Sequence, residues 1–477
     1  MKVNAFFLFL FIASASFSQT FVTTIHTELD EVAGKPLELD DGSFLVPVSR
    51  GVYNYLEEGL DYEEYIYRIS PLGAVTDSAR IAAPGDYYSG SLKLMRYDDR
   101  VFFWTTIDDT NELIHPGLRY GFLSDAMEVL QESILYSADT GRSFHDCIVN
   151  HNNNLLFAGV EYDFINQRQS ATVCELNPDE GVLRKSVIDH DSLLYFRQII
   201  ELPAIQKYHA CGFNEICQFN YDLDFEGILF YQPLEDTLFH YLDAQALTDS
   251  TYARCATAFG DPPNEDLEFG IGYYNHLARR TSTYVLGTPG RTDIAAHLDC
   301  RHPDSLLVGG TSSIPYWPKT IIRVINVHPS GTINWQLYYG DYGEYWVSGL
   351  IATRDGGCLI SGSYWLGLDD PDMERNVILI KVNNQGKLVG IEDDQKTSLT
   401  THLVYPNPGT DVLYLECGPG DGIFELYDIY GRQVAEQEFL SGQLMLDTSG
   451  LAKGLYQYLI LVDDWIVYSG KWIKISD

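Results

Sequence analysis

The stretch that decides the fold is residues 355–386, which reads DGGCLISG at 355–362, VILIKV at 377–382 and NNQG at 383–386. A turn rich in Asp and Gly leads into one apolar run, and a variable loop leads into the next. Gly accepts the positive φ that tight hairpin turns need. The stretch therefore predicts short antiparallel strands joined by tight turns.

The same pattern recurs along the chain. Turn-and-strand signals begin near residues 41, 99, 153, 207, 265, 304 and 355, mostly about 50 to 60 residues apart, and each marks the second strand of a unit. Turns between a third and a fourth strand stand at 70–73, 177–181, 328–331 and 383–386. Units of this length are typical of four-stranded propeller blades. We predict an all-β protein with a β-propeller of about seven blades.

Residues 21–27 alternate apolar and polar side chains, and we expect them to close the ring by pairing with the last blade. A pair of stacked β-sandwiches is the rival interpretation of the same strands. The regular recurrence favours the propeller.

Composition agrees with an exported β protein. The 477 residues include 33 Tyr, and aromatic residues make up 13% of the chain, which favours strands. With 31 basic against 67 acidic side chains, the net charge is −36. Binding nucleic acid needs a basic surface, so nucleic acid is excluded as a partner class.

The first 18 residues have the pattern of a secretory signal peptide. Lys2 supplies the positive charge, residues 6–13 are apolar, and Ser16 and Ser18 are the small residues before the cleavage site. We predict cleavage between Ser18 and Gln19. No other run is long and apolar enough to predict a transmembrane helix.

Eight cysteines are spread thinly along the chain. An exported chain can form disulfides, and Cys211 and Cys217 flank a hairpin-like segment, so we expect this pair to be bridged. We expect most of the others to be free and buried.

Three segments follow the signal peptide. Residues 19–389 form the predicted propeller, the polar residues 390–402 are a linker, and residues 403–477 form a smaller unit. Short strands are expected at 412–415, 423–427, 433–435, 443–446, 455–461 and 465–475. Short strands at close spacing predict a small immunoglobulin-like β-sandwich.

The terminal unit carries a set of motif residues in a defined order. They are Pro406, Asn407, Pro408, Leu426, Tyr427, Asp428, Gly431, Arg432, Gly454, Tyr456, Lys471 and Lys474. The two prolines stiffen the entry, Gly431 suits a hairpin turn, and Tyr456 is expected to pack in the sandwich.

These residues resemble the type A C-terminal sorting domain of the type IX secretion system of Bacteroidota. Trp472 and Cys417 depart from the family pattern. The resemblance implies export by the general secretory route, contact with the outer-membrane secretion machinery, and passage to the cell surface or the medium. It also implies that this domain is usually removed after export.

The sequence contains only weak candidates for a catalytic or metal-binding site. His297, Cys300 and His302 are close in sequence but lack a fourth metal ligand. An acidic loop with Asp369, Asp370, Asp372 and Glu374 offers oxygen ligands for Ca²⁺, but a solvated loop is the simpler interpretation. His145, Asp146 and His209 are candidates to face the channel, although ordinary polar positions on strands explain them as well. We expect no cofactor.

Function follows from the propeller rather than from a motif. Aromatic loops at 314–318 and 338–346 suit sugars or proteins, so we predict a binding module for glycan or protein, acting as a monomer. The alternative is a propeller hydrolase or lyase acting on polysaccharide or peptide.

Overall fold

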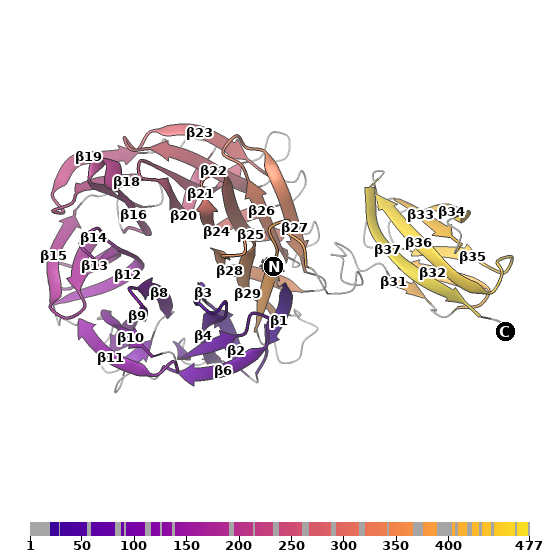
Figure 1. Cartoon of the computed structure of the whole chain (residues 1–477), viewed down its shortest axis with the longest axis horizontal. Coiled ribbons are helices and arrows are strands. Elements are labelled where there is room, and N and C mark those ends of the chain that lie inside the picture. Colours follow the sequence, from indigo (N-terminus) through magenta and orange to yellow (C-terminus); the bar gives the residue numbers. More distant parts are fainter. Residues whose placement is uncertain are drawn as a thin grey trace, which may run out of the picture.

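The computed structural model describes residues 20–475 except 28, 55–58, 82–86, 90–91, 110–115, 125, 136–138, 190–194, 213–214, 232–237, 260–266, 288–291, 314–319, 341–342, 366–374, 389–402, 406–408, 417–421, 429–431, 440–442 and 463–464. Seven of the nine sheets in this part of the chain stand radially around a central channel (Figure 1). The predicted all-β propeller with about seven blades is confirmed, and we number the blades one to seven along the chain.

The first two blades have interrupted inner strands. Blade one runs outward through β2 (Asp30–Ala33), β4 (Phe44–Asn54), β5 (Gly59–Ile69) and β6 (Val75–Arg80), with β3 (Leu37–Glu38) also paired to β4. Blade two has β7 (Tyr87–Ser89) and β8 (Lys93–Tyr97), both paired to β9 (Arg100–Asp109), then β10 (Gly117–Leu123) and β11 (Val129–Leu135).

Blades three to five each have four consecutive strands. Blade three is β12 (Thr140–Val149), β13 (Leu155–Asp163), β14 (Arg168–Asn177) and β15 (Gly181–Ile188). Blade four is β16 (Gln198–Leu202), β17 (Lys207–Cys211), β18 (Glu215–Asn220) and β19 (Phe225–Tyr231), with the 3₁₀ turn η1 (Pro203–Ile205) after its first strand. Blade five is β20 (Leu238–Thr248), β21 (Thr251–Phe259), β22 (Leu267–Asn275) and β23 (Arg280–Val285).

The two ends of the propeller chain meet in blade seven. Blade six is β24 (Asp293–His302), β25 (Ser305–Ser313), β26 (Thr320–Val327) and β27 (Ile333–Tyr339). Blade seven has β28 (Glu344–Ala352), β29 (Cys358–Trp365) and β30 (Asn376–Val382), and its outermost strand is β1 (Phe21–Ile25). Phe21 pairs with Lys381 and Ile25 with Val377. The expected closure of the ring by residues 21–27 is confirmed.

One predicted second strand was misplaced. The run near residue 265 belongs to β22, the third strand of blade five, and the second strand is β21. The apolar signal of β21 is interrupted by Arg254, which is buried with its guanidinium 4.0 Å from the centre of the Tyr241 ring. A buried arginine in the middle of the strand interrupts the apolar run by which a strand is predicted.

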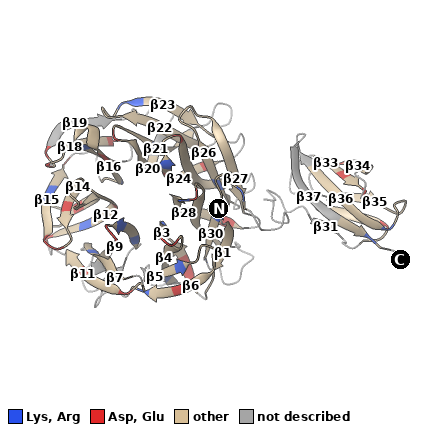
Figure 2. Cartoon of the chain, viewed as in Figure 1, with Lys and Arg blue, Asp and Glu red and all other residues tan. Residues whose placement is uncertain are grey.

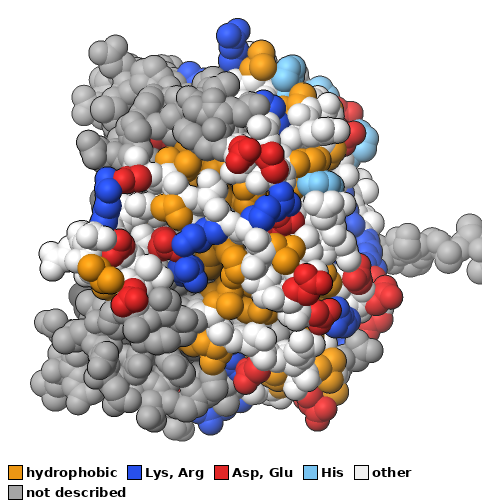
Figure 3. Space-filling view, turned by 90° about the vertical axis from the view of Figure 1, so that its left-hand side faces the viewer, with side chains coloured by type: hydrophobic (Ala, Val, Ile, Leu, Met, Phe, Trp, Pro, Cys, Tyr) orange, Lys and Arg blue, Asp and Glu red, His pale blue; other side chains and the backbone are white. Residues whose placement is uncertain are grey.

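Apolar side chains fill the spaces between neighbouring blades. Leu156 of blade three packs with Phe196 and Tyr208 of blade four in one such cluster. Outer strands are more exposed, and Val182 and Leu183 of β15 are examples of exposed apolar residues. On the side of the ring seen in Figure 3, apolar side chains lie among charged ones. Figure 2 shows acidic and basic positions distributed around the ring.

The expected Cys211–Cys217 disulfide is wrong, because both cysteines are free and buried. Cys211 pairs with Ile216 and Cys217 with Ala210, so the two side chains leave the sheet on opposite faces. Cys211 packs towards blade five and Cys217 towards blade three. The other five described cysteines are also free.

The remaining two sheets form the terminal sandwich. One contains β31 (Leu403–Tyr405), β32 (Val412–Glu416) and β35 (Gln443–Asp447), and the other contains β34 (Gln433–Phe439), β33 (Gly422–Tyr427), β36 (Gly454–Val462) and β37 (Trp465–Lys474). Trp472, Phe424 and Leu413 are fully buried between them. Among the described residues, no helix has the length and apolar character to cross a membrane.

Candidate functional site

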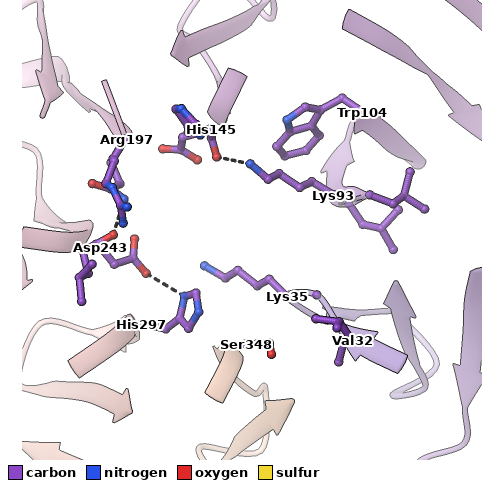
Figure 4. A pocket seen from close by; sticks show the side chains of 16 residues that line it. Val32, Lys35, Lys93, Trp104, His145, Arg197, Asp243, His297 and Ser348 are labelled. Carbon is purple, nitrogen blue, oxygen red and sulfur yellow. Dashed lines mark hydrogen bonds and ion pairs between the residues drawn. The ribbon is translucent and has the colours of Figure 1, made fainter. Parts of the chain in front are cut away.

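The central channel contains a cavity of about 400 Å³ (Figure 4). Inner strands of all seven blades contribute to its wall. The polar and charged residues at this wall are Lys35, Lys93, Trp104, His145, Asp146, Arg197, Gln198, Asp243, His297 and Ser348. A second cavity of about 360 Å³ shares Lys35, Asp146 and Asp243 and extends to Glu201 and Gln245.

Irregularities of the inner strands bring side chains to this wall. His145, Leu242, Ala296 and Ser348 are skipped in the pairing of their strands, so each stands at a β-bulge. A bulge leaves one residue unpaired and re-aims its side chain. His145, Leu242 and Ser348 line the cavity as a result, and so does His297 beside the bulge of blade six.

Glycines opposite these bulges explain why the second strands end in small residues. Gly310 pairs with Ala295 at the bulge of blade six, and a Cβ at Gly310 would meet the Ile294 carbonyl oxygen. Gly159 and Gly362 stand in the same relation to the bulges of blades three and seven. The recurring glycine of the sequence is therefore what permits the bulge.

Three basic residues of the wall lie at strand starts or breaks. Lys35 lies between β2 and β3, Lys93 opens β8, and Arg197 directly precedes β16. Lys93 Nζ donates to the carbonyl oxygens of His145 at 2.5 Å and Phe144 at 3.4 Å.

Lys93 and Arg197 place two positive charges near His145 at the cavity wall. The pKa of Lys93 is lowered to about 8, mainly by burial; the charge of Asp146 opposes this shift and the charge of Arg197 contributes to it. Burial, together with the charges of Lys93 and Arg197, lowers the pKa of His145 to about 4. His145 is therefore neutral at pH 7 while the two cations remain beside it.

Three aspartates join neighbouring blades, and we call them the latch aspartates: Asp146, Asp243 and Asp299. In each, Oδ1 accepts the backbone N–H of the next residue, at 2.8–2.9 Å. Oδ2 accepts a backbone N–H of the following blade, from Ile199 at 2.9 Å, Leu298 at 3.0 Å and Ala352 at 2.8 Å respectively. Both oxygens of each carboxylate thus hold backbone in place.

Lys35 is the counter-charge of the latch aspartates. Burial lowers its pKa, but the three carboxylates outweigh burial and hold that pKa above its ordinary value. Burial raises the pKa of Asp146 to about 6. For Asp243, burial is outweighed by His297 and Lys35, so its pKa lies below the ordinary value. His297 Nδ1 lies 3.7 Å from an Asp243 oxygen.

The sequence candidates for chemistry are only partly brought together. His145 and Asp146 reach the channel, whereas His209 is buried beside Tyr252, with its Nδ1 3.2 Å from the tyrosine hydroxyl. His297 faces the channel, but Cys300 and His302 lie further along β24 and face other neighbours. Within the described ranges, no group of three or more His, Cys, Asp or Glu is placed to hold a metal ion.

Sequence reasoning missed the basic residues and Trp104 at the wall. Only 31 residues of the chain are basic. A basic residue at the start of a predicted inner strand is therefore uncommon, and it could have indicated a residue that faces the channel. The acidic loop at 369–374, the aromatic loop at 314–318 and the cleavage site at Ser18 and Gln19 lie outside the described residues, as does the linker at 390–402.

Motif residues of the terminal sandwich are engaged in its own fold. Arg432 Nε donates to Asp428 Oδ2 at 2.8 Å, and the Arg432 backbone N–H donates to Asp428 Oδ1 at 3.0 Å. The Asp428 backbone N–H donates to the Arg432 carbonyl oxygen at 2.9 Å, so this pair closes the hairpin between β33 and β34. Leu426 is fully buried. Tyr427 is half-buried, and its hydroxyl donates to Glu425 at 2.7 Å.

The last two strands hold the remaining motif residues. Tyr456 is buried as expected, and its hydroxyl donates to the Ala452 carbonyl at 2.6 Å, as in a tyrosine corner. Gly454 opens β36 with φ of 156°. Lys474 is buried, and its amine donates to the Thr448 carbonyl. Lys471 lies in β37, while Pro406, Asn407, Pro408 and Gly431 lie outside the described residues.

Residues 403–474 match the family model described as the secretion system C-terminal sorting domain. The chain therefore carries this domain after its propeller, and it is exported across the outer membrane to the cell surface or the extracellular space. The sorting domain is the part that contacts the type IX secretion machinery. No curated protein matches the chain.

Solved structures with similar folds are remote in sequence. A fungal alcohol oxidase of the AA5 family in complex with copper has 8% identity and a TM-score of 0.44, over 96% of this chain and 99% of that one. The propeller domain of the Trilobed protease from Pyrococcus furiosus has 10% identity and a TM-score of 0.42, over 76% and 99%.

PorZ, an essential bacterial surface component of the type IX secretion system of Porphyromonas gingivalis, has 9% identity and a TM-score of 0.27, over 93% of this chain and 81% of that one. All three TM-scores lie below 0.5, so the fold assignment rests on the strand order of this chain itself.

Proposed function

We propose that the exported propeller is a glycan-binding module that takes a sugar residue of its ligand into the channel cavity. The observation that carries this proposal is the hydrogen-bonding state of the polar groups at the cavity wall. Lys93 and Trp104 bring hydrogen-bond donors to the wall, while the carboxylates of Asp146 and Asp243 accept bonds from backbone N–H groups.

The size of the cavity supports a small polar ligand. Its volume of about 400 Å³ is within the range of about 300–1,000 Å³ for ligand pockets. Gln198 and Ser348 add neutral polar groups to the wall. Such groups suit the hydroxyls of a sugar, because each hydroxyl both donates and accepts a hydrogen bond.

Binding is favoured over glycoside cleavage by the state of the carboxyl groups. Hydrolysis of a glycoside needs one carboxyl group as acid and a second as base or nucleophile, both directed at the scissile bond. Asp146 and Asp243 direct both oxygens at backbone N–H groups instead. A hydrolase or lyase is accordingly the second hypothesis, and a protein ligand is the third.

A glycan array with mass analysis separates these hypotheses. The exported protein is applied to the array, and each glycan that it retains is then incubated with it and weighed. We expect retention of a defined group of glycans with unchanged mass. Shortened or unsaturated products would establish an enzyme, and absence of any glycan binding would refute the proposal.

A pair of variants places the binding site. Gln198→Leu removes the side-chain amide from the wall, so we expect at least tenfold weaker retention. Gln385→Leu, in an exposed turn of blade seven, is the matched control and should bind as the unaltered protein does. Equal binding by both variants would place the ligand outside the channel.

A further inference from the structure

We propose that the corner of the channel formed by Lys93, Trp104 and Arg197 is an anion subsite, which recognises the negatively charged group of an acidic sugar. This inference rests on the proposed glycan binding and specifies the class of glycan. It concerns blades two to four, at one side of the cavity (Figure 4).

Trp104 provides the first independent observation. It lies on β9 directly opposite Lys93, and its side chain is 5% exposed. The indole Nε1–H has no hydrogen-bond partner among the described residues. Figure 4 shows the indole beside the Lys93 side chain at the cavity wall. A buried donor without an acceptor costs about 1–3 kcal/mol, which a ligand oxygen at this position would recover.

Gln198 provides the complementary observation. Its side chain is 8% exposed, and its Nε2 donates to the Leu242 carbonyl at 2.6 Å. Its Oε1 is buried without a donor partner among the residues described. Trp104 Nε1–H and Gln198 Oε1 are therefore one donor and one acceptor without a partner among the described residues. A ligand that satisfies both carries an acceptor oxygen and a hydroxyl, as sugars do. The charges of Lys93 and Arg197 at the same wall favour an anionic acceptor oxygen, which is the chemistry of an acidic sugar.

Charge at this corner is positive although the chain as a whole is acidic. The charge of Arg197 lowers the pKa of Lys93, and both cations lower the pKa of His145. Asp146 is the carboxylate whose charge raises the pKa of Lys93, and its two oxygens accept bonds from the backbone N–H groups of Cys147 and Ile199. Lys35 is not included, because the latch aspartates surround it with opposite charge.

Lys93 is held in place for this role. Its bonds to the His145 and Phe144 carbonyls use two of the three ammonium protons and fix the amine at the cavity wall. The third proton remains for a ligand. Partial desolvation of the site strengthens an ion pair formed there.

Calorimetric titration of the exported protein tests the subsite. The probes are a trigalacturonate, a sulfated galactose trisaccharide and the neutral galactose trisaccharide. We expect at least one anionic probe to bind tenfold or more tightly than the neutral one. The carboxylate and sulfate arms then identify which anionic group the corner accepts.

Variants assign the effect to Lys93. Lys93→Met should weaken binding of the anionic probe at least tenfold while changing binding of the neutral probe less than threefold. Lys93→Arg keeps the charge and should restore affinity to within threefold, which separates loss of charge from misfolding. Lys185→Met, on the outer strand β15, is the control for removal of a basic residue and should leave affinity unchanged.

The outcomes separate this inference from the proposed function. Tight binding of the neutral probe with no gain from charge would overturn the anion subsite and leave glycan binding intact. An equal effect of Lys93→Met and Lys185→Met would also overturn it. Failure of every array glycan and every probe to bind would refute both.

Discussion

Gly310 shows how one residue shapes the channel. It pairs with Ala295 where the inner strand of blade six bulges, and it leaves room for the Ile294 carbonyl. The bulge in turn directs His297 to the cavity. Its neighbour Gly309 has only ordinary contacts, the nearest being Leu350 at 3.5 Å.

We predict that Gly310→Ala lowers the free energy of unfolding by about 1–3 kcal/mol, the usual cost of overpacking. Gly309→Ala is the matched control, because its added methyl group meets no backbone atom. Chemical denaturation of the two variants measures the difference. Equal stability of both would show that the glycine is not needed for the bulge.

The buried carboxyl group of Glu64 is a second single residue with a large effect, because it makes the stability of the protein depend on pH. It is 2% exposed, and its carboxylate accepts bonds from the Ser49 hydroxyl and the Leu92 backbone N–H. Burial raises its pKa from 4.5 to about 7. The folded chain thus retains a proton between these pH values that the unfolded chain releases, so stability falls as pH rises through this range.

We predict that Glu64→Gln gains stability over the unaltered protein as pH rises from 4.5 to 8, by up to about 3 kcal/mol. Unfolding curves across this range measure the gain, and Glu63→Gln, a partly exposed neighbour on β5, controls for loss of a carboxylate. A difference between Glu64→Gln and the unaltered protein that does not change with pH would contradict the assignment.

At the scale of elements, the latch aspartates connect inner strands of successive blades. Asp299 joins blade six to blade seven by accepting the Ala352 N–H at 2.8 Å. Blade seven is also where β1 closes the ring, so this contact lies at the closing point of the fold. Hydrogen bonds to charged groups contribute about 1.5–3 kcal/mol each.

Asp299→Ala should therefore lower the free energy of unfolding by about 3–6 kcal/mol, since two backbone N–H groups lose their acceptor. Asp304→Ala, in the exposed turn of the same hairpin, should change it by less than about 0.5 kcal/mol. Thermal unfolding of both variants checks this. If Asp299→Ala lowers the free energy of unfolding no more than Asp304→Ala does, the hydrogen bonds of Asp299 do not stabilise the contact between blades six and seven.

The elements themselves were largely predictable, and the channel wall was not. Alternation and turn residues gave the blades, the closing strand β1 and the sandwich strands, because these depend on local pattern. The missed strand β21 contains a buried arginine, which breaks that pattern. Lys93, Trp104 and Gln198 meet only when the ring closes, and bulges change which way a strand points its side chains.

At the scale of the whole molecule, the sorting domain and the propeller have separate tasks. Motif residues such as Asp428 and Arg432 stabilise the sandwich that directs export. The polar cavity lies in the propeller, and its wall contains no residue of the terminal sandwich. We infer that ligand binding does not need the sorting domain.

The most direct measurement is a crystal structure of the exported protein with the acidic trisaccharide that binds it most tightly. We predict ligand density in the channel, with an anionic oxygen within hydrogen-bond distance of Lys93 Nζ and Trp104 Nε1. Intact ligand seated there would establish the channel as a binding site. Ligand density confined to the outer surface of the ring, or a cleaved product in the channel, would contradict the account.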